Sequence, residues 1–273
     1  MLSRQNSGLQ NPKGEALFRR LWSHRSLVWA LVRRQYQVRY RQSMVGVTWA
    51  ILPPVATLAT GLLVFKGIAD VDTGKEDYSV VTMAALVPWT FFATSLANGI
   101  PSIVSSSTML TRIPFPRAAI ALGNIGISMV DFAISLVIFL IIVYTQGDGL
   151  PLTALWFPAL FAIELMLVLG VVLVASAMNV FARDIKLGVP LGIQLWMILT
   201  PVLYPLNEVP EAMKSFVRAN PMTGVVESFR DVLVHGTAPD PAILWPTIAG
   251  AVVLLFVGSW YFSAVEPRFA DVV

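Results

Sequence analysis

Charged residues and cysteines are what this sequence has least of. Of its 273 residues, 13% are charged and 56% are hydrophobic, and the mean hydropathy is +0.71. Average soluble domains carry about 25% charged residues, so this chain cannot cover the surface of a soluble globule of 29.8 kDa with charge. The shortage argues against an ordinary soluble enzyme and against a disordered chain, and it indicates an integral membrane protein.

Cysteine is absent, and this absence restricts the chemistry. It excludes disulfides, thiolate metal sites and a thiol nucleophile. His24 and His235 are the only histidines, so we expect neither a metal site nor a catalytic residue. No phosphate loop of the form Gly-x-x-x-x-Gly-Lys-Ser/Thr occurs. We therefore expect no cofactor in this chain; if ATP drives it, another chain must bind the nucleotide.

Long stretches nearly free of charge are the main positive feature. A helix needs about 20 apolar residues to cross a bilayer, and unpaired backbone groups are not tolerated in lipid. The stretches do not alternate in polarity as barrel strands do. The sequence predicts an all-α integral membrane protein with six transmembrane helices, at about 44–68, 80–104, 118–144, 153–182, 187–206 and 241–265.

Lysine and arginine give the orientation. Cytoplasmic segments of membrane proteins carry an excess of these residues. Fourteen of the 19 lie in 1–43, in the second and fourth connections or in the tail 266–273, and nine of them lie in 1–43 alone. Both termini are therefore expected in the cytoplasm. The sequence pI of about 9.3 then reports topology, and we expect no nucleic acid partner.

Two further segments are amphipathic. Residues 1–43 repeat apolar residues at helical spacing between arginines, and Trp22 and Trp29 suit the lipid headgroup region. This pattern predicts an interfacial helix, or two; the alternative is a soluble helix packed on a partner. Residues 207–240 carry two helical patterns separated by Asn220-Pro221, which predict two short amphipathic helices at the membrane interface before the last span.

Several motifs, taken in order, resemble one family. They are Arg39, Tyr40, Ser43, Gly46, Trp49 and Pro53-Pro54 around the first span, Phe115-Pro116-Arg117, Arg183-Asp184, Thr200–Pro205, Asn220–Thr223 and Arg230. The set resembles the permease subunits of polysaccharide-exporting ABC transporters. The resemblance implies a homodimer of six-span subunits in the bacterial inner membrane that exports a lipid-linked polysaccharide such as O-antigen, teichoic acid or capsule. It also implies a separate cytoplasmic ATPase subunit that binds ATP and Mg²⁺. For the segment 207–240, it implies re-entrant helices that cap the outer exit; the alternative is a pair of interfacial helices.

The segment 105–117 is the expected contact with that ATPase. It is too apolar for a purely solvated loop, and the resemblance implies a short helix seated in a groove of the partner. The candidate coupling residues are Thr108, Met109, Arg112, Phe115, Pro116 and Arg117. The candidates for the cytoplasmic entrance are Arg39, Tyr40 and Arg41. The alternative for the segment is a loop packed on its own membrane domain.

Aromatic residues are candidates for the substrate path, because flat apolar sugar faces can stack on rings. We select Trp49, Trp89, Phe92, Trp196 and Tyr204. Of these, Trp49, Trp196 and Tyr204 rank first, since the resemblance implies that spans one and five line the conduit at the dimer interface. The alternative is ordinary packing, or the usual enrichment of Trp and Tyr at membrane interfaces.

Asp131 and Glu164 are the only charged residues deep in a span. Both lie the same number of positions from the turn at Gln146–Gly149, so a hairpin would place them at similar depth. If they face each other they can share a proton, which would suit a proton-coupled secondary carrier; otherwise they are polar contacts within one subunit. A membrane-embedded transferase or hydrolase is a third class, but the acidic first outer loop has no His or Cys beside it.

Overall fold

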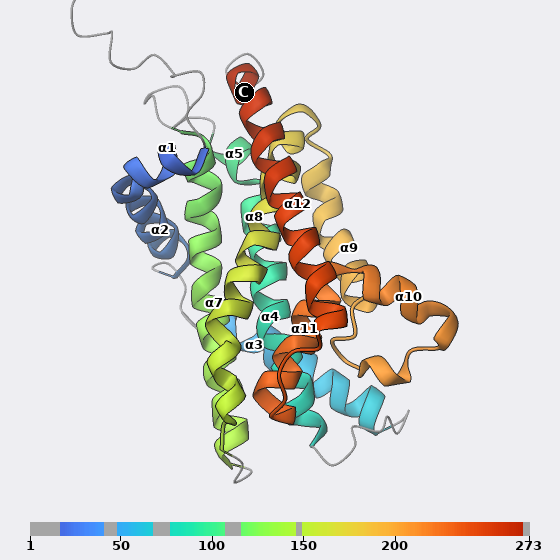
Figure 1. The fold of residues 1–273 in the computed structure, drawn as a ribbon. Helices are drawn as coiled ribbons and strands as arrows, with labels where there is room; N and C mark the ends of the chain where they lie inside the picture. The colour runs from blue at the N-terminus through green and yellow to red at the C-terminus, as the bar shows by residue number, and fades with distance from the viewer. Residues whose placement is uncertain (1–16, 41–47, 68–76, 107–115, 146–148, 270–273) are drawn as a thin grey trace, which may run out of the picture.

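The computed structural model describes residues 17–40, 48–67, 77–106, 116–145 and 149–269 (Figure 1). Within these ranges the chain is helical and contains no strand, which confirms the all-α prediction. The described helices in chain order are α1 Leu17–Ser23, α2 Arg25–Tyr40, α3 Thr48–Gly61 with the π-helix η2 Leu62–Lys66, α4 Tyr78–Gly99, α5 Ser102–Ser105, α7 Ala118–Thr145, η3 Leu152–Trp156, α8 Phe157–Phe181, α9 Ile185–Ile198, η4 Leu206–Glu208, α10 Glu211–Ala219, α11 Pro221–Arg230, η5 Asp231–His235, α12 Pro241–Val265 and η6 Glu266–Arg268.

Four long helices form the bundle. The helices α4, α7, α8 and α12 are the four in the described ranges that are long and apolar enough to cross a membrane. They run side by side, with α4 inside the bundle and α9 on its far flank from α7 (Figure 1). The apolar helices within α3–η2 and in α9 are shorter. Their length and apolar composition agree with the predicted membrane protein, while the six-span arrangement stays a prediction.

The bundle has two ends, which we call the α5 end and the α11 end. The α5 end carries α5, the first turn of α7, the turn between α8 and α9, and η6. The α11 end carries the first turn of α4, η3, η5 and the start of α12 (Figure 1). The predicted orientation would place the α5 end at the cytoplasm.

The helix α9 ends earlier than the expected span 187–206. Its last residue is Ile198, and the chain is not regularly helical from Leu199 to Pro205. Pro201 and Pro205 explain the break, because proline has no backbone N–H to donate and its ring clashes with the preceding turn. The fifth predicted span is therefore a short helix followed by an irregular segment.

The helices α8 and α12 touch backbone to backbone. A Cβ placed on Gly170 of α8 would lie 2.5 Å from the backbone carbon of Leu254, and one on Gly258 would lie 2.6 Å from the Gly170 oxygen. Small residues allow such close approach, which is how helices associate strongly in a membrane. This contact places α12 against the bundle and leaves its other face uncovered.

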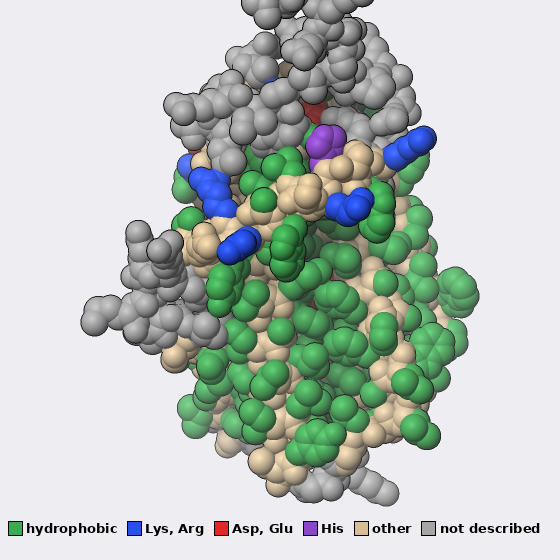
Figure 2. Space-filling view, turned by 90° about the vertical axis from the view of Figure 1, so that its left-hand side faces the viewer, with side chains coloured by type: hydrophobic (Ala, Val, Ile, Leu, Met, Phe, Trp, Pro, Cys, Tyr) green, Lys and Arg blue, Asp and Glu red, His purple; other side chains and the backbone are tan. Residues whose placement is uncertain are grey.

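The N-terminal helix α2 packs on α7 of the same chain. Leu31 is buried, and a Cβ on Gly123 would lie 2.7 Å from the Leu31 Cβ. Trp22 and Trp29 remain 73% and 71% exposed. Figure 2 shows Lys and Arg side chains gathered at the level of this helix, with a hydrophobic surface below them. One face of α2 is thus held by its own bundle, while Trp22 of α1 and Trp29 of α2 remain exposed.

Candidate functional site at the broken end of α9

An uncovered apolar stripe runs along α9. Leu187, Leu191, Leu195 and Ile198 follow one another at helical spacing and are between 52% and 71% exposed. A Cβ on Gly188 or Gly192 would meet no atom within 4 Å. No residue of α9 is buried. This face of the bundle is therefore available to a second chain, to substrate or to lipid.

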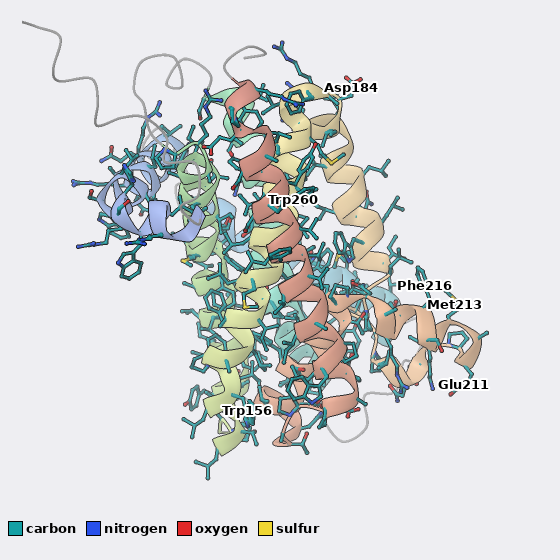
Figure 3. The ribbon with its side chains drawn as sticks, turned by 45° about the horizontal axis from the view of Figure 1, so that its top comes forward. Trp156, Asp184, Glu211, Met213, Phe216 and Trp260 are labelled. Carbon is teal, nitrogen blue, oxygen red and sulfur yellow. The ribbon has the colours of Figure 1, made fainter. Side chains whose placement is uncertain are left out.

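A hollow of about 350 Å³ lies where α9 meets the short helices that follow it. It is lined by Gly192, Leu195, Trp196, Leu199, Phe216 and Asn220. The helix α10 lies beside this hollow and projects sideways from the bundle (Figure 3). In that view Met213 and Phe216 lie above and Glu211 lies below. Met213 and Phe216 are 49% and 62% exposed. The amphipathic pattern predicted for this segment is present in α10, and its apolar side borders the hollow.

The predicted path aromatics do not form one exposed surface. The rings of Phe92 and Trp196 meet edge to face with centroids 4.9 Å apart, and Trp89 lies 5.6 Å from Phe92. Phe92 is fully buried and Trp89 is 5% exposed, so both pack within the bundle in this conformation. Trp196 lines the hollow, the hydroxyl of Tyr204 donates to the Ile198 carbonyl at 2.7 Å, and Trp49 lies in α3.

The buried Arg230 supports the irregular segment after α9. Its guanidinium donates to the carbonyl of Val202 at 2.8 Å and to that of Tyr204 at 3.3 Å. It also donates to the carbonyl of Val81 on α4 at 3.3 Å and pairs with Glu227 at 2.6 Å. A broken helix leaves carbonyls without partners, and such groups are costly in lipid. From α11, Arg230 therefore supplies donors to two carbonyls of this irregular segment, those of Val202 and Tyr204.

Asn220 and Tyr78 complete this support. The amide nitrogen of Asn220 donates to the hydroxyl of Thr200 at 2.8 Å, and its oxygen accepts from the Trp196 indole at 3.0 Å. The same oxygen caps α11 by accepting from the Met222 N–H. The Tyr78 hydroxyl donates to the Leu203 carbonyl at 2.7 Å. One network therefore joins α4, α11 and the broken end of α9.

Sequence reasoning reached this network only in part. Asn220-Pro221 is a readable helix start, since Asn favours the N-cap and Pro the first turn. In the sequence, the family motif indicates a role for Arg230. The sequence does contain one further indication of its role: Arg230 is a single arginine within an apolar helical pattern. An arginine on the buried face of a helix must find hydrogen-bond acceptors. Which carbonyls it binds depends on where α9 breaks.

The coupling and entrance candidates are only partly described. Thr108, Met109, Arg112 and Phe115 lie outside the described residues, as does Arg41, while Arg39 and Tyr40 end α2. Pro116 is buried just before α7. The backbone N–H of Arg117 donates to the Glu266 carboxylate at 2.8 Å, and its guanidinium donates to the Glu266 carbonyl at 2.6 Å. Arg117 therefore joins the start of α7 to the end of α12.

The two membrane carboxylates are both buried. Asp131 on α7 is 2% exposed and Glu164 on α8 is fully buried. Neither oxygen of Glu164 has a hydrogen-bond partner among the described residues, so a proton shared directly with Asp131 is not seen. Thr223 of α11 and Ser95 of α4 are also buried without a partner in that part of the chain. Of the described residues, no three of His, Asp or Glu are grouped as a metal site would need.

Comparison with known proteins decides the family. The model of the ABC-2 type transporter family matches residues 26–234, which run from the start of α2 into η5. The chain belongs to the ABC-2 type transporter family. This confirms the resemblance that the ordered motifs indicated.

Relatives of this ABC-2 chain match it over nearly its full length. The O-antigen export system permease protein RfbA of Klebsiella pneumoniae is 28% identical over 248 residues, which are 90% of this chain and 95% of that protein. The protein of the same name from Myxococcus xanthus is 29% identical over 257 residues, with coverage of 93% and 98%. The polysialic acid transport protein KpsM of Escherichia coli is 20% identical over 230 residues, with coverage of 84% and 89%.

Proposed function

We propose that this chain is the membrane subunit of an ATP-driven exporter that moves a lipid-linked, O-antigen-like polysaccharide across the bacterial inner membrane. The similarity to O-antigen export permeases along nearly the whole chain supports this proposal most directly. The chain itself carries no phosphate loop. A separate ATPase subunit binds ATP and Mg²⁺ and drives transport.

The subunit works as a homodimer joined along α9. The stripe of Leu187, Leu191, Leu195 and Ile198 supports this, because the neighbouring Gly188 and Gly192 are open and would let a second helix approach closely. The hollow beside Trp196 and Phe216 then lies next to the seam. Polysaccharide passes there, since aromatic faces can cover the apolar faces of sugars.

The alternative of a proton-coupled carrier has one observation in its favour. Glu164 is a fully buried carboxyl without a hydrogen-bond partner among the described residues, and an acid inside a membrane is a functional candidate. The proposed exporter, by contrast, needs ATP hydrolysis and no proton gradient.

Reconstitution distinguishes these two functions. The chain is co-reconstituted with its ATPase in liposomes, and export of a labelled lipid-linked glycan is measured with ATP or with an imposed proton gradient. We expect transport with ATP alone, and we expect it to persist when Asp131→Asn and Glu164→Gln are combined. Transport that follows the proton gradient without ATP, and that is lost in the double variant, would replace our proposal with the carrier.

A further inference from the structure

A second hollow lies on the flank of the bundle opposite α9. It has a volume of about 280 Å³ and is built from α7, from η3 with the first turn of α8, and from η5. Its lining is Leu136, Phe139, Leu140, Leu150, Ala154, Leu155, Phe157, Pro158 and Leu233. No lining side chain carries a polar atom, so the hollow offers nothing to a sugar, a phosphate or an ion.

The hollow continues an exposed apolar surface. On α7, Val137 and Ile141 directly follow the lining residues Leu136 and Leu140, and they are 53% and 57% exposed. Figure 2 shows this flank covered by hydrophobic side chains below the level of α2. Since α7 and α9 lie on opposite flanks in Figures 1 and 3, a dimer joined along α9 leaves this surface in contact with the bilayer.

Aromatic side chains place the mouth of the hollow near the membrane surface. Tyr144 and Trp156 are 65% and 45% exposed at the α11 end, and Trp156 is labelled there in Figure 3. Tyr and Trp are enriched at the level of the headgroups. Leu136 precedes Tyr144 by eight residues, or about 12 Å along a helix. The hollow therefore extends from the headgroup level into the hydrocarbon, in the direction of a lipid tail.

One wall of the hollow belongs to the segment that supports α9. Leu233 lies in η5, which continues directly from α11 and Arg230. The hydroxyl of Thr153 in η3 donates to the Val232 carbonyl at 2.8 Å, which ties this wall to the start of α8. An occupant of the hollow therefore touches both α7 and the segment that leads back to the broken end of α9.

We propose that this hollow binds one acyl chain of a glycerophospholipid from the leaflet at the α11 end. The inference rests on the proposed function only for the position of the dimer seam. That position also indicates which lipid supplies the acyl chain. The lipid anchor of a polysaccharide would leave from the seam on the opposite flank, so the acyl chain in this hollow comes from a membrane phospholipid. A methylene group takes up about as much space as a water molecule, roughly 30 Å³, so the hollow accommodates a substantial part of one chain.

Photocrosslinking tests the site directly. The full chain with its ATPase is placed in nanodiscs containing a phosphatidylethanolamine with a diazirine in mid-chain, and labelled residues are mapped by mass spectrometry. We expect label concentrated on Leu136, Leu140, Ala154 and Leu233 over Val137 and Ile141. We expect Ala154→Trp to abolish label on the other lining residues, while Ile141→Trp on the same flank preserves it.

Several outcomes would overturn the site. These are equal labelling of Val137 and Ile141, label retained in Ala154→Trp, preferential labelling by a diazirine polyprenyl phosphate, or a crosslink from the hollow to a second copy. If Ala154→Trp fails to elute as folded protein, Leu136→Phe is used in its place. Part of the same purified preparation is reconstituted in liposomes, and export is measured there. Absence of export with labelling intact counts against the proposed function and leaves the lipid site standing.

Discussion

At the scale of the residue, Arg230 is the side chain on which the most contacts depend. It is 1% exposed and reaches the carbonyls of Val81, Val202 and Tyr204 as well as Glu227. A buried charge is tolerated only when it is paired and hydrogen-bonded. The arginine thus satisfies carbonyls of the irregular segment that follows α9, while its carbonyl acceptors and Glu227 compensate its burial.

We predict that Arg230→Met strongly destabilises the protein. Removing one partner of a buried ion pair leaves the other uncompensated, which typically costs about 3–5 kcal/mol. Thermal unfolding of the detergent-solubilised protein should show the loss. Arg218→Met on the exposed side of α10 is the matched control and should lie within about 0.5 kcal/mol of the parent. Equal stability of the two variants would contradict a supporting role for Arg230.

His235 gives a pH dependence at the same scale. Its Nδ1 lies 3.4 Å from the Asp231 carboxylate, and this hydrogen bond raises the pKa of the imidazole above its ordinary 6.5. A pKa raised by folding adds stability that is fully present below the unfolded value and is lost as the pH rises through the folded value. We predict that stability falls as the pH is raised above 6.5, and that His235→Gln removes this part of the profile. A parent profile identical to that of the variant would rule the effect out.

At the scale of the element, α9 and α8 contrast in how their glycines are used. Gly170 of α8 is pressed against the backbone of α12, whereas Gly188 and Gly192 of α9 meet nothing within 4 Å. Both helices read as apolar segments with small residues in the sequence. Only the packed structure separates the glycines that hold one subunit together from those that are available to a second one.

We predict that Gly192→Leu leaves the subunit folded and weakens the dimer. The added side chain has room within the subunit but would hold a second α9 away. The fraction of dimer is measured by light scattering after size-exclusion chromatography. Gly149→Leu is the control, because that position is also open and lies away from α9. An undiminished dimer in Gly192→Leu would show that the subunits meet elsewhere.

We predict the opposite behaviour for Gly170→Leu. A side chain there would collide with the backbone of Leu254 and Leu255, where no rotamer change can make room. Separating α8 from α12 should lower the melting temperature of the subunit itself. A melting temperature equal to that of Gly192→Leu would mean that the two helices adjust without cost.

At the scale of the whole molecule, the start of α7 is joined to the end of α12. Arg117 holds Glu266 through both its backbone N–H and its guanidinium, and its guanidinium carbon lies 5.6 Å from the centre of the Phe269 ring. A push on the segment before α7 would therefore also reach α12. Since α12 packs closely on α8 through Gly170 and Gly258, the movement would extend to the interior of the bundle.

We predict that Phe115→Ala uncouples the assembled exporter. The apolar ring is the expected contact with the ATPase, so its loss should leave hydrolysis running while export falls. Both rates are measured on the same liposomes. Thr237→Ala, at the α11 end, is the control and should change neither rate. Normal export at normal hydrolysis in Phe115→Ala would remove this residue from the coupling contact.

The sequence by itself determined the class of this protein. Few charges, long apolar stretches and ordered motifs were enough for an all-α membrane chain of the ABC-2 family. Lipid restricts the backbone to helices or closed barrels, and the stretches do not alternate in polarity as barrel strands do. The tertiary structure decided which residues are buried inside the subunit and which remain exposed on its surface. It buried Trp89 and Phe92, left the α9 stripe uncovered, and gave Arg230 its acceptors. These contacts join segments far apart in the chain, and the spacing of residues along a helix carries no information about which other helix its faces will meet.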